Sequence, residues 1–218
     1  MQHNGAVIEV HNVSKHIKGR QILDAVSFVI QHGSISGIKG HNGAGKSMLL
    51  RTIAGLVLPS HGHVRVFGER IGADAEFPRD TGAMIDGPGL LPHYSGFQNL
   101  HFLAMIRNRI SKAEIADAMR LVGLNPDDKR PVRTYSTGMR QRLGIAQAIM
   151  EHPALLLLDE PTSAIDAEGR QVIYRILQQQ REQGATILLT SHSEEELAAL
   201  CDQIFFMDGG KLVGSRAM

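Results

Sequence analysis

Residues 40–47 combine glycines with a lysine and a serine in a spacing that suits phosphate chemistry. They read Gly-His-Asn-Gly-Ala-Gly-Lys-Ser, which matches the pattern G-x-x-x-x-G-K-S. Glycines let the backbone approach a ligand closely, and a helix that begins at Lys46 adds N–H groups and the positive end of its dipole. Lys46 is expected to reach the outer phosphates and Ser47 to bind Mg²⁺. The predicted nucleotide contacts in this segment are Gly40, His41, Asn42, Gly43, Ala44, Gly45, Lys46, Ser47 and Met48.

Two adjacent carboxylates, Asp159 and Glu160, follow the apolar run at 155–158. A buried parallel strand has such a continuous run of leucine, and its carboxyl end opens onto the ligand crevice. Neighbouring residues on a strand point to opposite sides, so the two acids can do different work. Asp159 is expected to hold Mg²⁺, directly or through water, and Glu160 to accept a proton from the attacking water. Alone, the pair could equally be the solvated end of a strand, but the phosphate loop favours the functional interpretation.

The elements that must position these groups alternate between strands and helices. Strands are expected at 7–10, 25–30, 34–38, 64–66, 155–158 and 186–190, with a hairpin at 204–207 and 211–213. Helices are expected from Lys46 to a stop at Gly55, near 111–122, from about Ser136, and over 167–183. This alternation predicts an α/β fold, in which helices flank a mostly parallel sheet and the early strands form a small antiparallel β subdomain.

We expect one domain over residues 1–218. Its nucleotide-binding core, with the β subdomain, takes 1–86 and 151–218, and an α-helical subdomain is inserted at 87–150.

Two local patterns are given structural interpretations. The run Glu194-Glu195-Glu196, with Ser193 and Glu196 as a capping box, is read as a solvated first turn of a helix. The pair in His61-Gly62-His63 is read as a turn and not a metal site, because no third ligand is nearby in the sequence.

The composition excludes several classes of protein. The chain has 218 residues, of which 43% are hydrophobic and 21% charged, and these values exclude a disordered or membrane-embedded chain. The formal net charge of +1 offers no strong field for nucleic acid, so no nucleic-acid partner is expected. The first residues do not have the pattern of a signal peptide, and no apolar run approaches ~20 residues, which favours a cytoplasmic protein. The single cysteine, Cys201, is expected to be a packed thiol.

Four further segments carry a resemblance to a known family. The segment 135–142 reads Tyr-Ser-Thr-Gly-Met-Arg-Gln-Arg, and the segment 163–166 reads Ser-Ala-Ile-Asp. The third segment, 190–192, reads Thr-Ser-His, and the fourth is the stretch around Asp86. In that order they resemble the signature motif, the D-loop, the switch histidine and the Q-loop of the ATP-binding cassette of ABC transporters. The resemblance covers nearly the whole chain, and the signature is its most specific element because other phosphate-loop proteins lack it. It implies a P-loop NTPase fold of the ABC type.

The resemblance also implies an ATPase that works as a dimer with ATP and Mg²⁺. Catalytic roles fall to Lys46, Glu160 and His192, whose imidazole would bond to the γ-phosphate and to the attacking water. Ser136 and Gly138, at the start of a helix, would bind a phosphate of the ATP that a second subunit holds. Two chains arranged head to tail would then enclose two ATP molecules, and a homodimer is the expected arrangement.

Three features depart from the usual family pattern. Asp86 stands in place of a glutamine; it cannot donate a hydrogen bond as an amide does, but it can accept one from water or approach Mg²⁺. The signature begins Tyr-Ser-Thr-Gly-Met, and this sequence and the acid at position 86 resemble the bacitracin- and lantibiotic-type exporters. Ile17, or its neighbour His16, stands where an aromatic residue stacks on adenine. A weaker contact with the base is therefore expected.

An apolar set lies where the sheet should meet the helical insertion, and it consists of Leu90, Leu91, Tyr94, Phe97, Leu100 and Phe102. It is interpreted either as ordinary core or as a groove for a helix of a membrane subunit, which the resemblance places near Tyr94 and Phe97. The chain would then be the ATP-hydrolysing subunit of an exporter of antibiotic peptides or similar compounds. It would lie on the inner face of the cell membrane with a separate transmembrane permease as partner. The alternatives are a soluble ABC ATPase and a nucleotide-sensing module that is not coupled to transport.

Overall fold

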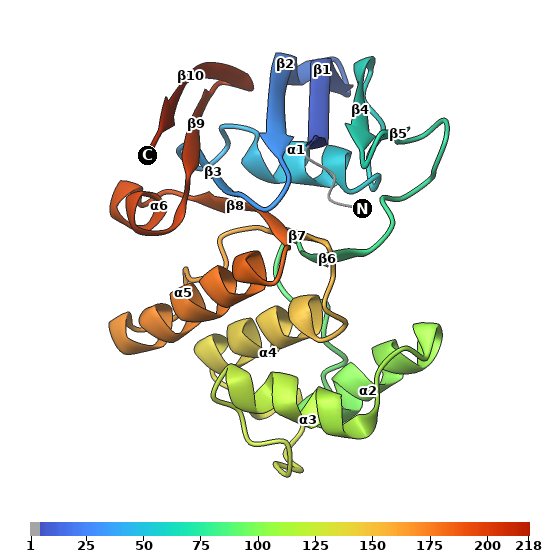
Figure 1. Cartoon of the computed structure of the whole chain (residues 1–218), viewed down its shortest axis with the longest axis vertical. Helices are drawn as coiled ribbons and strands as arrows, with labels where there is room; N and C mark the ends of the chain where they lie inside the picture. The colour runs from blue at the N-terminus through green and yellow to red at the C-terminus, as the bar shows by residue number, and fades with distance from the viewer. Residues whose placement is uncertain (1–4) are drawn as a thin grey trace.

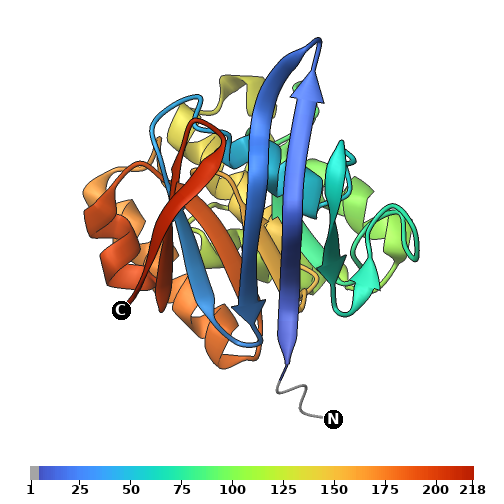
Figure 2. The same ribbon diagram turned by 90° about the horizontal axis from the view of Figure 1, so that it is seen from above.

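The computed structural model describes residues 5–218 and contains two β-sheets. The smaller sheet is antiparallel and has the strand order β2-β1-β4-β5. Its strands are β1 (Ala6–Ile17), β2 (Arg20–Gln31), β4 (His61–Val66) and β5 (Glu69–Arg70). Lys18 and Gly19 join β1 to β2, and both have positive φ angles, as a tight two-residue hairpin turn requires. Figure 2 shows the two long strands side by side.

The larger sheet has six strands in the order β10-β9-β3-β8-β7-β6. They are β3 (Ile35–Lys39), β6 (Thr81–Met84), β7 (Leu155–Leu158), β8 (Thr186–Ser191), β9 (Gln203–Asp208) and β10 (Lys211–Ala217). All neighbouring pairs are parallel except the hairpin of β9 and β10. An early strand, β3, therefore lies between two late strands, β8 and β9, and the carboxyl ends of β3, β7 and β8 meet at one edge of the sheet.

Helices cover both faces of the larger sheet (Figure 1). Helix α1 (Lys46–Ile53) lies between the two sheets, whereas α2 (Gly96–Arg107), α3 (Lys112–Leu121), α4 (Thr137–Ile149) and α5 (Ala167–Glu182) lie on the other face. The short helix α6 (Glu194–Leu200) follows β8. The side chains of Ser111, Ser136 and Asp166 each accept a backbone N–H in the first turn of α3, α4 and α5. The predicted α/β architecture is confirmed.

The core consists of two clusters of buried side chains, one on each face of the larger sheet. Leu155 and Leu157 of β7 pack with α1 and the smaller sheet. Leu156 and Leu158 pack with α2, α4 and α5. Successive side chains on a strand point to opposite faces, and both faces are covered here, so the strand is leucine throughout. The apolar run before the two carboxylates is thus the central layer of the molecule.

The segment 61–63 differs from the prediction, because it begins β4 and is not a turn. His61 and His63 pair with Ser14 and His11 of β1. Gly62 has a φ of 78°, at an irregularity in this pairing, so the glycine marks a bulge within a strand. Within residues 5–218, no group of three or more His, Cys, Asp or Glu side chains is arranged to hold a metal ion.

Two observations bear on the expectations from composition. Cys201 is buried, and burial raises the pKa of its thiol to about 12, so it is the packed thiol that was predicted. None of the helices described here combines the length and the apolar character that a membrane crossing requires.

Candidate active site

The segment between β3 and α1 folds around the side chain of Lys46. Gly45, the residue before α1, has a φ of 103°, and a β-carbon on it would lie only 2.8 Å from Met207 Cε. The positive φ is what favours glycine here, since the flexible end of the Met207 side chain could move aside. The ammonium of Lys46 donates to the carbonyl oxygens of Gly40 at 2.7 Å and His41 at 3.3 Å. The lysine is only 6% exposed, so the loop fixes a buried positive charge at the start of a helix.

His41 anchors the same loop to the end of β9. Its Nδ1 lies 2.7 Å from the carbonyl oxygen of Asn42, and its Nε2 lies 2.8 Å from a carboxylate oxygen of Asp208. Both acceptors favour the imidazolium form, so the hydrogen bond to Asn42 and then the one to Asp208 raise the pKa of His41. The loop thus carries a second group whose protonated form is favoured by its hydrogen-bond partners.

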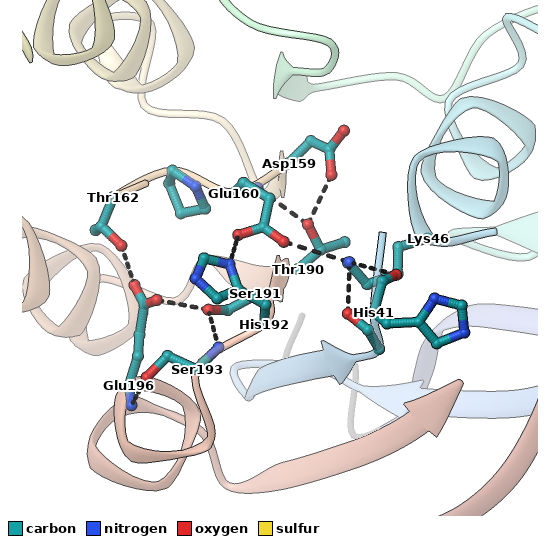
Figure 3. Close-up of polar contacts among 12 residues, drawn as sticks. His41, Lys46, Asp159, Glu160, Thr162, Thr190, Ser191, His192, Ser193 and Glu196 are labelled. Carbon is teal, nitrogen blue, oxygen red and sulfur yellow. Dashed lines mark hydrogen bonds and ion pairs between the residues drawn. The ribbon is translucent and has the colours of Figure 1, made fainter. Parts of the chain in front are cut away.

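A single hydroxyl, that of Thr190 on β8, fixes both carboxylate residues after β7. It donates to Asp159 Oδ1 at 2.6 Å and accepts the backbone N–H of Glu160 at 3.0 Å. The N–H of Asp159 also donates to the carbonyl oxygen of Met84 at the end of β6. The parallel neighbours of β7 therefore determine where both acids lie; Figure 3 shows the contacts of Thr190 with them.

Glu160 lies between the two other residues predicted to be catalytic. Its Oε1 is 3.3 Å from Lys46 Nζ, and its Oε2 is 3.0 Å from His192 Nδ1 (Figure 3). Oε1 is buried and lacks a hydrogen bond within residues 5–218, so its contact with Lys46 is electrostatic and poorly aligned. The backbone of Glu160 has a φ of 47°, a left-handed conformation that costs a non-glycine residue roughly 1–2 kcal/mol. Strain of this kind clusters at functional sites.

Asp86, after β6, is bound by an arginine of α1. Nε and Nη2 of Arg51 both lie 2.6 Å from Asp86 Oδ2, and this hydrogen bond raises the pKa of Arg51. Arg51 lies one turn after Ser47 on α1, so Asp86 is held beside the helix that follows the loop. Its expected approach to Mg²⁺ stays a prediction, and it requires this carboxylate to share or leave Arg51.

The predicted signature residues lie at the start of α4, on the opposite face of the larger sheet from α1 (Figure 1). Ser136 accepts the N–H of Met139 at 3.1 Å and so caps the helix. A β-carbon on Gly138 would lie 3.0 Å from the carbonyl oxygen of Ala164, so the glycine permits close packing on the segment 163–166. Arg142 reaches Asp166 in that segment at 3.4 Å. Signature and predicted D-loop therefore form one surface, apart from Lys46.

Sequence reasoning missed the part played by Gln141 of α4. Its Nε2 donates to two consecutive carbonyl oxygens, Glu160 at 2.9 Å and Pro161 at 3.0 Å. The side chain is only 8% exposed. A signal was present, because Gln141 shares the buried side of α4 with Ile145 and Ala148, four and seven residues later. A polar residue on such a stripe needs a buried partner.

Residues 194–196 form the predicted first turn of α6, and Glu195 is exposed, but the interpretation as a solvated turn is wrong for Glu196. Glu196 is buried, and its carboxylate accepts the hydroxyls of Thr162 and of Ser191, the latter at 2.6 Å. The predicted capping box is therefore only half formed: Ser193 caps Glu196 N–H, but the N–H of Ser193 donates to Ser191. Glu194 is paired with Lys39 and Arg216. A carboxylate that could reach its own helix terminus is instead used to join three segments near His192.

The remaining predicted contacts lie outside this cluster. Ile17 ends β1 and is 39% exposed. In the apolar set near β6, Leu100 is fully buried, and Leu90 and Phe97 are partly buried against the core. Tyr94 is 42% exposed and stacks edge-on against Phe102 with 5.0 Å between ring centroids. The set therefore divides into core members and surface members.

A comparison with known families decides the identity of this arrangement. The sequence profile described as "ABC transporter" matches residues 23–163, which span the phosphate loop, the signature segment and the two carboxylates. The chain belongs to the ABC transporter family. The recognised resemblance is thus confirmed, and with it the assignment of the chain as an ATP-binding subunit with ATPase activity.

Individual relatives agree with this ABC assignment. The ABC transporter ATP-binding protein YybJ of Bacillus subtilis (strain 168) is 44% identical over 94% of this chain and 94% of its own. The bacitracin transport ATP-binding protein BcrA of Enterococcus faecalis is 35% identical over 95% of this chain and 68% of its own. A solved ATP-binding subunit of an ABC transporter superposes with a TM-score of 0.87 at 25% identity, over 97% of this chain and 90% of that one. The ABC-type fold is therefore confirmed as well.

Proposed function

We propose that this ABC subunit hydrolyses ATP with Glu160 as the general base and with Lys46 and His192 holding the terminal phosphate. The observation that carries the proposal is the position of the Glu160 carboxylate, which touches Lys46 on one side and His192 on the other. A base must be near both the phosphate and the group that orients the attacking water. Lys46 and His192 would mark those two places.

The nucleotide would bind along the loop from Gly40 to Met48. Its phosphates would receive the loop N–H groups and the ammonium of Lys46, which would exchange the carbonyl oxygens of Gly40 and His41 for phosphate oxygens. Ile17 would lie against the adenine ring of the nucleotide. An exposed aliphatic side chain offers less contact than a stacked aromatic ring, so recognition would depend mainly on the phosphates.

Mg²⁺ fits the donor set at this edge of the sheet. Ser47 and Asp159 offer a hydroxyl and a carboxylate, and Asp86 a second carboxylate, all oxygen ligands of the kind that Mg²⁺ prefers. Mg²⁺ usually keeps several waters and shares substrate phosphates, so it needs only one or two carboxylates from the protein. When bound, it would neutralise charge on the phosphate oxygens.

Ser136 and Gly138 would contact the ATP of a second copy of the chain. Their place at the start of α4, away from Lys46, supports this arrangement, because a helix N-terminus there favours an anion from outside the subunit. Two copies placed head to tail would enclose two ATP molecules. The inserted unit at 87–150 would then carry the signature. The nucleotide-binding core, 1–86 with 151–218, would carry the phosphate loop and the general base Glu160.

The proposed cargo is suggested by the names of relatives. The bacitracin transport protein of Enterococcus faecalis supports an exporter of antibiotic peptides or similar compounds. A separate permease in the cell membrane would then bind this subunit from the cytoplasmic side, near Tyr94 and Phe97. Tyr94 has the exposure such a contact needs, whereas Phe97 would contribute mainly by supporting it.

Replacement of Glu160 by glutamine tests the proposal. The Glu160→Gln variant keeps the size of the side chain but cannot accept the proton, so ATP turnover should fall about 10²-fold or more while ATP binding persists. Size-exclusion chromatography with ATP should show a dimer that does not dissociate. Undiminished turnover would reject Glu160 as the base, and turnover absent from the unmodified protein, with and without its permease, would favour a nucleotide-sensing module.

A further inference from the structure

The backbone of Glu160 is held by side-chain hydrogen bonds on two sides. On one side its N–H donates to the hydroxyl of Thr190 at 3.0 Å. On the other side its carbonyl oxygen accepts Gln141 Nε2 at 2.9 Å. Between these two bonds the φ angle is 47°, in the left-handed region that an L-residue occupies only when its surroundings require it. The direction of the carboxylate therefore depends on what holds the backbone.

The amide of Gln141 suits this position for a chemical reason. One nitrogen with two hydrogens serves two consecutive carbonyl groups, those of Glu160 and Pro161, in a buried place. Proline has no N–H, so this stretch of backbone cannot satisfy itself through a regular ladder. An apolar side chain of the same volume would fill the space but leave the Pro161 carbonyl without this donor and free the backbone at Glu160.

We infer that Gln141 is a positioning residue for ATP hydrolysis, which fixes the left-handed backbone of Glu160 and thereby aims its carboxylate between Lys46 and His192. The inference rests on the proposed role of Glu160 as base. Gln141 touches neither the loop at 40–47 nor His192 through a hydrogen bond; its bonds go to the backbone that carries the base.

The same bonds connect the base to the signature helix. Gln141 lies in α4, about 7.5 Å along the axis from Ser136, which caps that helix. If Ser136 and Gly138 bind the ATP of a second copy, any shift of this turn reaches Glu160 through one rigid helix and two hydrogen bonds. Gln141 would then make turnover at a subunit's own ATP depend on the ATP that its signature holds.

Gln141→Met tests the inference by removing both donors at nearly constant volume. We expect kcat to fall about ten-fold, a change typical of one or two lost hydrogen bonds, while Kd for ATP stays within about two-fold. Gln147→Met is the matched control. Gln147 lies on the same helix, and its Oε1 is buried without a hydrogen-bond partner within residues 5–218. The kcat of the Gln147→Met variant should stay within about two-fold of that of the unmodified protein. Equal kcat values for the two variants would overturn the inference.

A double variant separates positioning from general loss of structure. If Gln141 acts through Glu160, adding Gln141→Met to Glu160→Gln should lower turnover no further, because the base is already absent. A further ten-fold loss would mean that Gln141 acts elsewhere and would overturn the inference. Turnover retained by Glu160→Gln alone would instead reject the proposed base, so the two failures are distinguishable.

Gln141→Glu covers the case in which the methionine variant does not fold. At neutral pH this variant would face two carbonyl oxygens with an acceptor, and protonation at lower pH would restore one donor. Its kcat relative to the unmodified protein should therefore rise as the pH falls from about 8 to about 6. A constant ratio across that range would count against the hydrogen-bond explanation.

Discussion

Glu196 shows how a single side chain can hold the site together without touching a phosphate. Its buried carboxylate accepts hydroxyls from Thr162, after β7, and from Ser191, beside His192. Glu196→Ala should leave both buried hydroxyls without their hydrogen-bond acceptor and lower the free energy of unfolding by about 2–4 kcal/mol, measured by urea denaturation.

Its neighbour Glu195 gives the control for that measurement. Glu195 is exposed on the same turn of α6, so Glu195→Ala should change the free energy of unfolding by no more than about 0.5 kcal/mol. If the two variants unfold at the same urea concentration, the hydroxyl network around Glu196 contributes nothing to stability.

At the scale of elements, α3 is specified by its own first turn. Ser111 accepts the N–H of Glu114, and the Glu114 carboxylate accepts the N–H of Ser111, which completes a capping box. Ser111→Ala should cost about 1 kcal/mol and lower Tm by roughly 2–4 °C in a chain of this size. ATP turnover should be unchanged, because α3 packs on α2 and α4 away from Lys46 and Glu160.

Differential scanning calorimetry would measure this effect, with Lys112→Ala as the control. Lys112 is exposed and follows the cap, so its removal should leave Tm nearly unchanged. Equal Tm values for the two variants would show that the capping box does not stabilise α3.

Local signals were sufficient to predict most elements and the centre of the site. The sequence pattern predicted helices at the places of α3, α4 and α5, and continuous leucine predicted β7 as a fully buried strand. The phosphate-loop pattern predicted Lys46, the leucine run predicted the site of the two acids, and the family resemblance predicted His192; the fold brings Lys46, Glu160 and His192 into contact. Such signals suffice where one element determines its own ends, or where parallel strands must meet at one edge.

Contacts made across elements could not be predicted in the same way. Glu196 had the spacing of a capping box, but burial and two hydroxyls compete for its carboxylate more strongly than the exposed end of α6. Arg51 binds Asp86 only because α1 lies beside the end of β6. The amide of Gln141 finds its acceptor, the carbonyl oxygen of Pro161, only because the fold brings that distant segment beside α4. In each case the partner comes from a distant segment, which a local pattern does not contain.

At the scale of the whole molecule, the surface around Tyr94 is where the proposed permease would bind. Tyr94→Ala should remove most co-purification with the transmembrane subunit from solubilised membranes, while Kd for ATP stays within about two-fold. The reason is that Tyr94 is half exposed and supported by Phe102, with no contact to the site around Lys46.

Val213→Ala provides a matched control for this measurement. Val213 is a 64% exposed apolar residue on β10, at the opposite edge of the larger sheet from β6. Its removal should leave co-purification unchanged. If Tyr94→Ala co-purifies as well as Val213→Ala, docking occurs elsewhere; if it also loses ATP binding, the residue serves the core and not a partner.

The position of β3 in the larger sheet has a consequence for synthesis of the chain. The loop that carries Lys46 directly follows β3, yet both neighbours of β3 in the sheet are the late strands β8 and β9. While a ribosome is still translating residues before 186, β3 has neither edge paired, so the strand edge is open to other nascent chains. The small sheet of β1, β2 and β4 can form early from nearby residues. The phosphate loop gains its flanking strands only after β8 and β9 have been made, so a nascent chain that ends before residue 186 should bind no ATP.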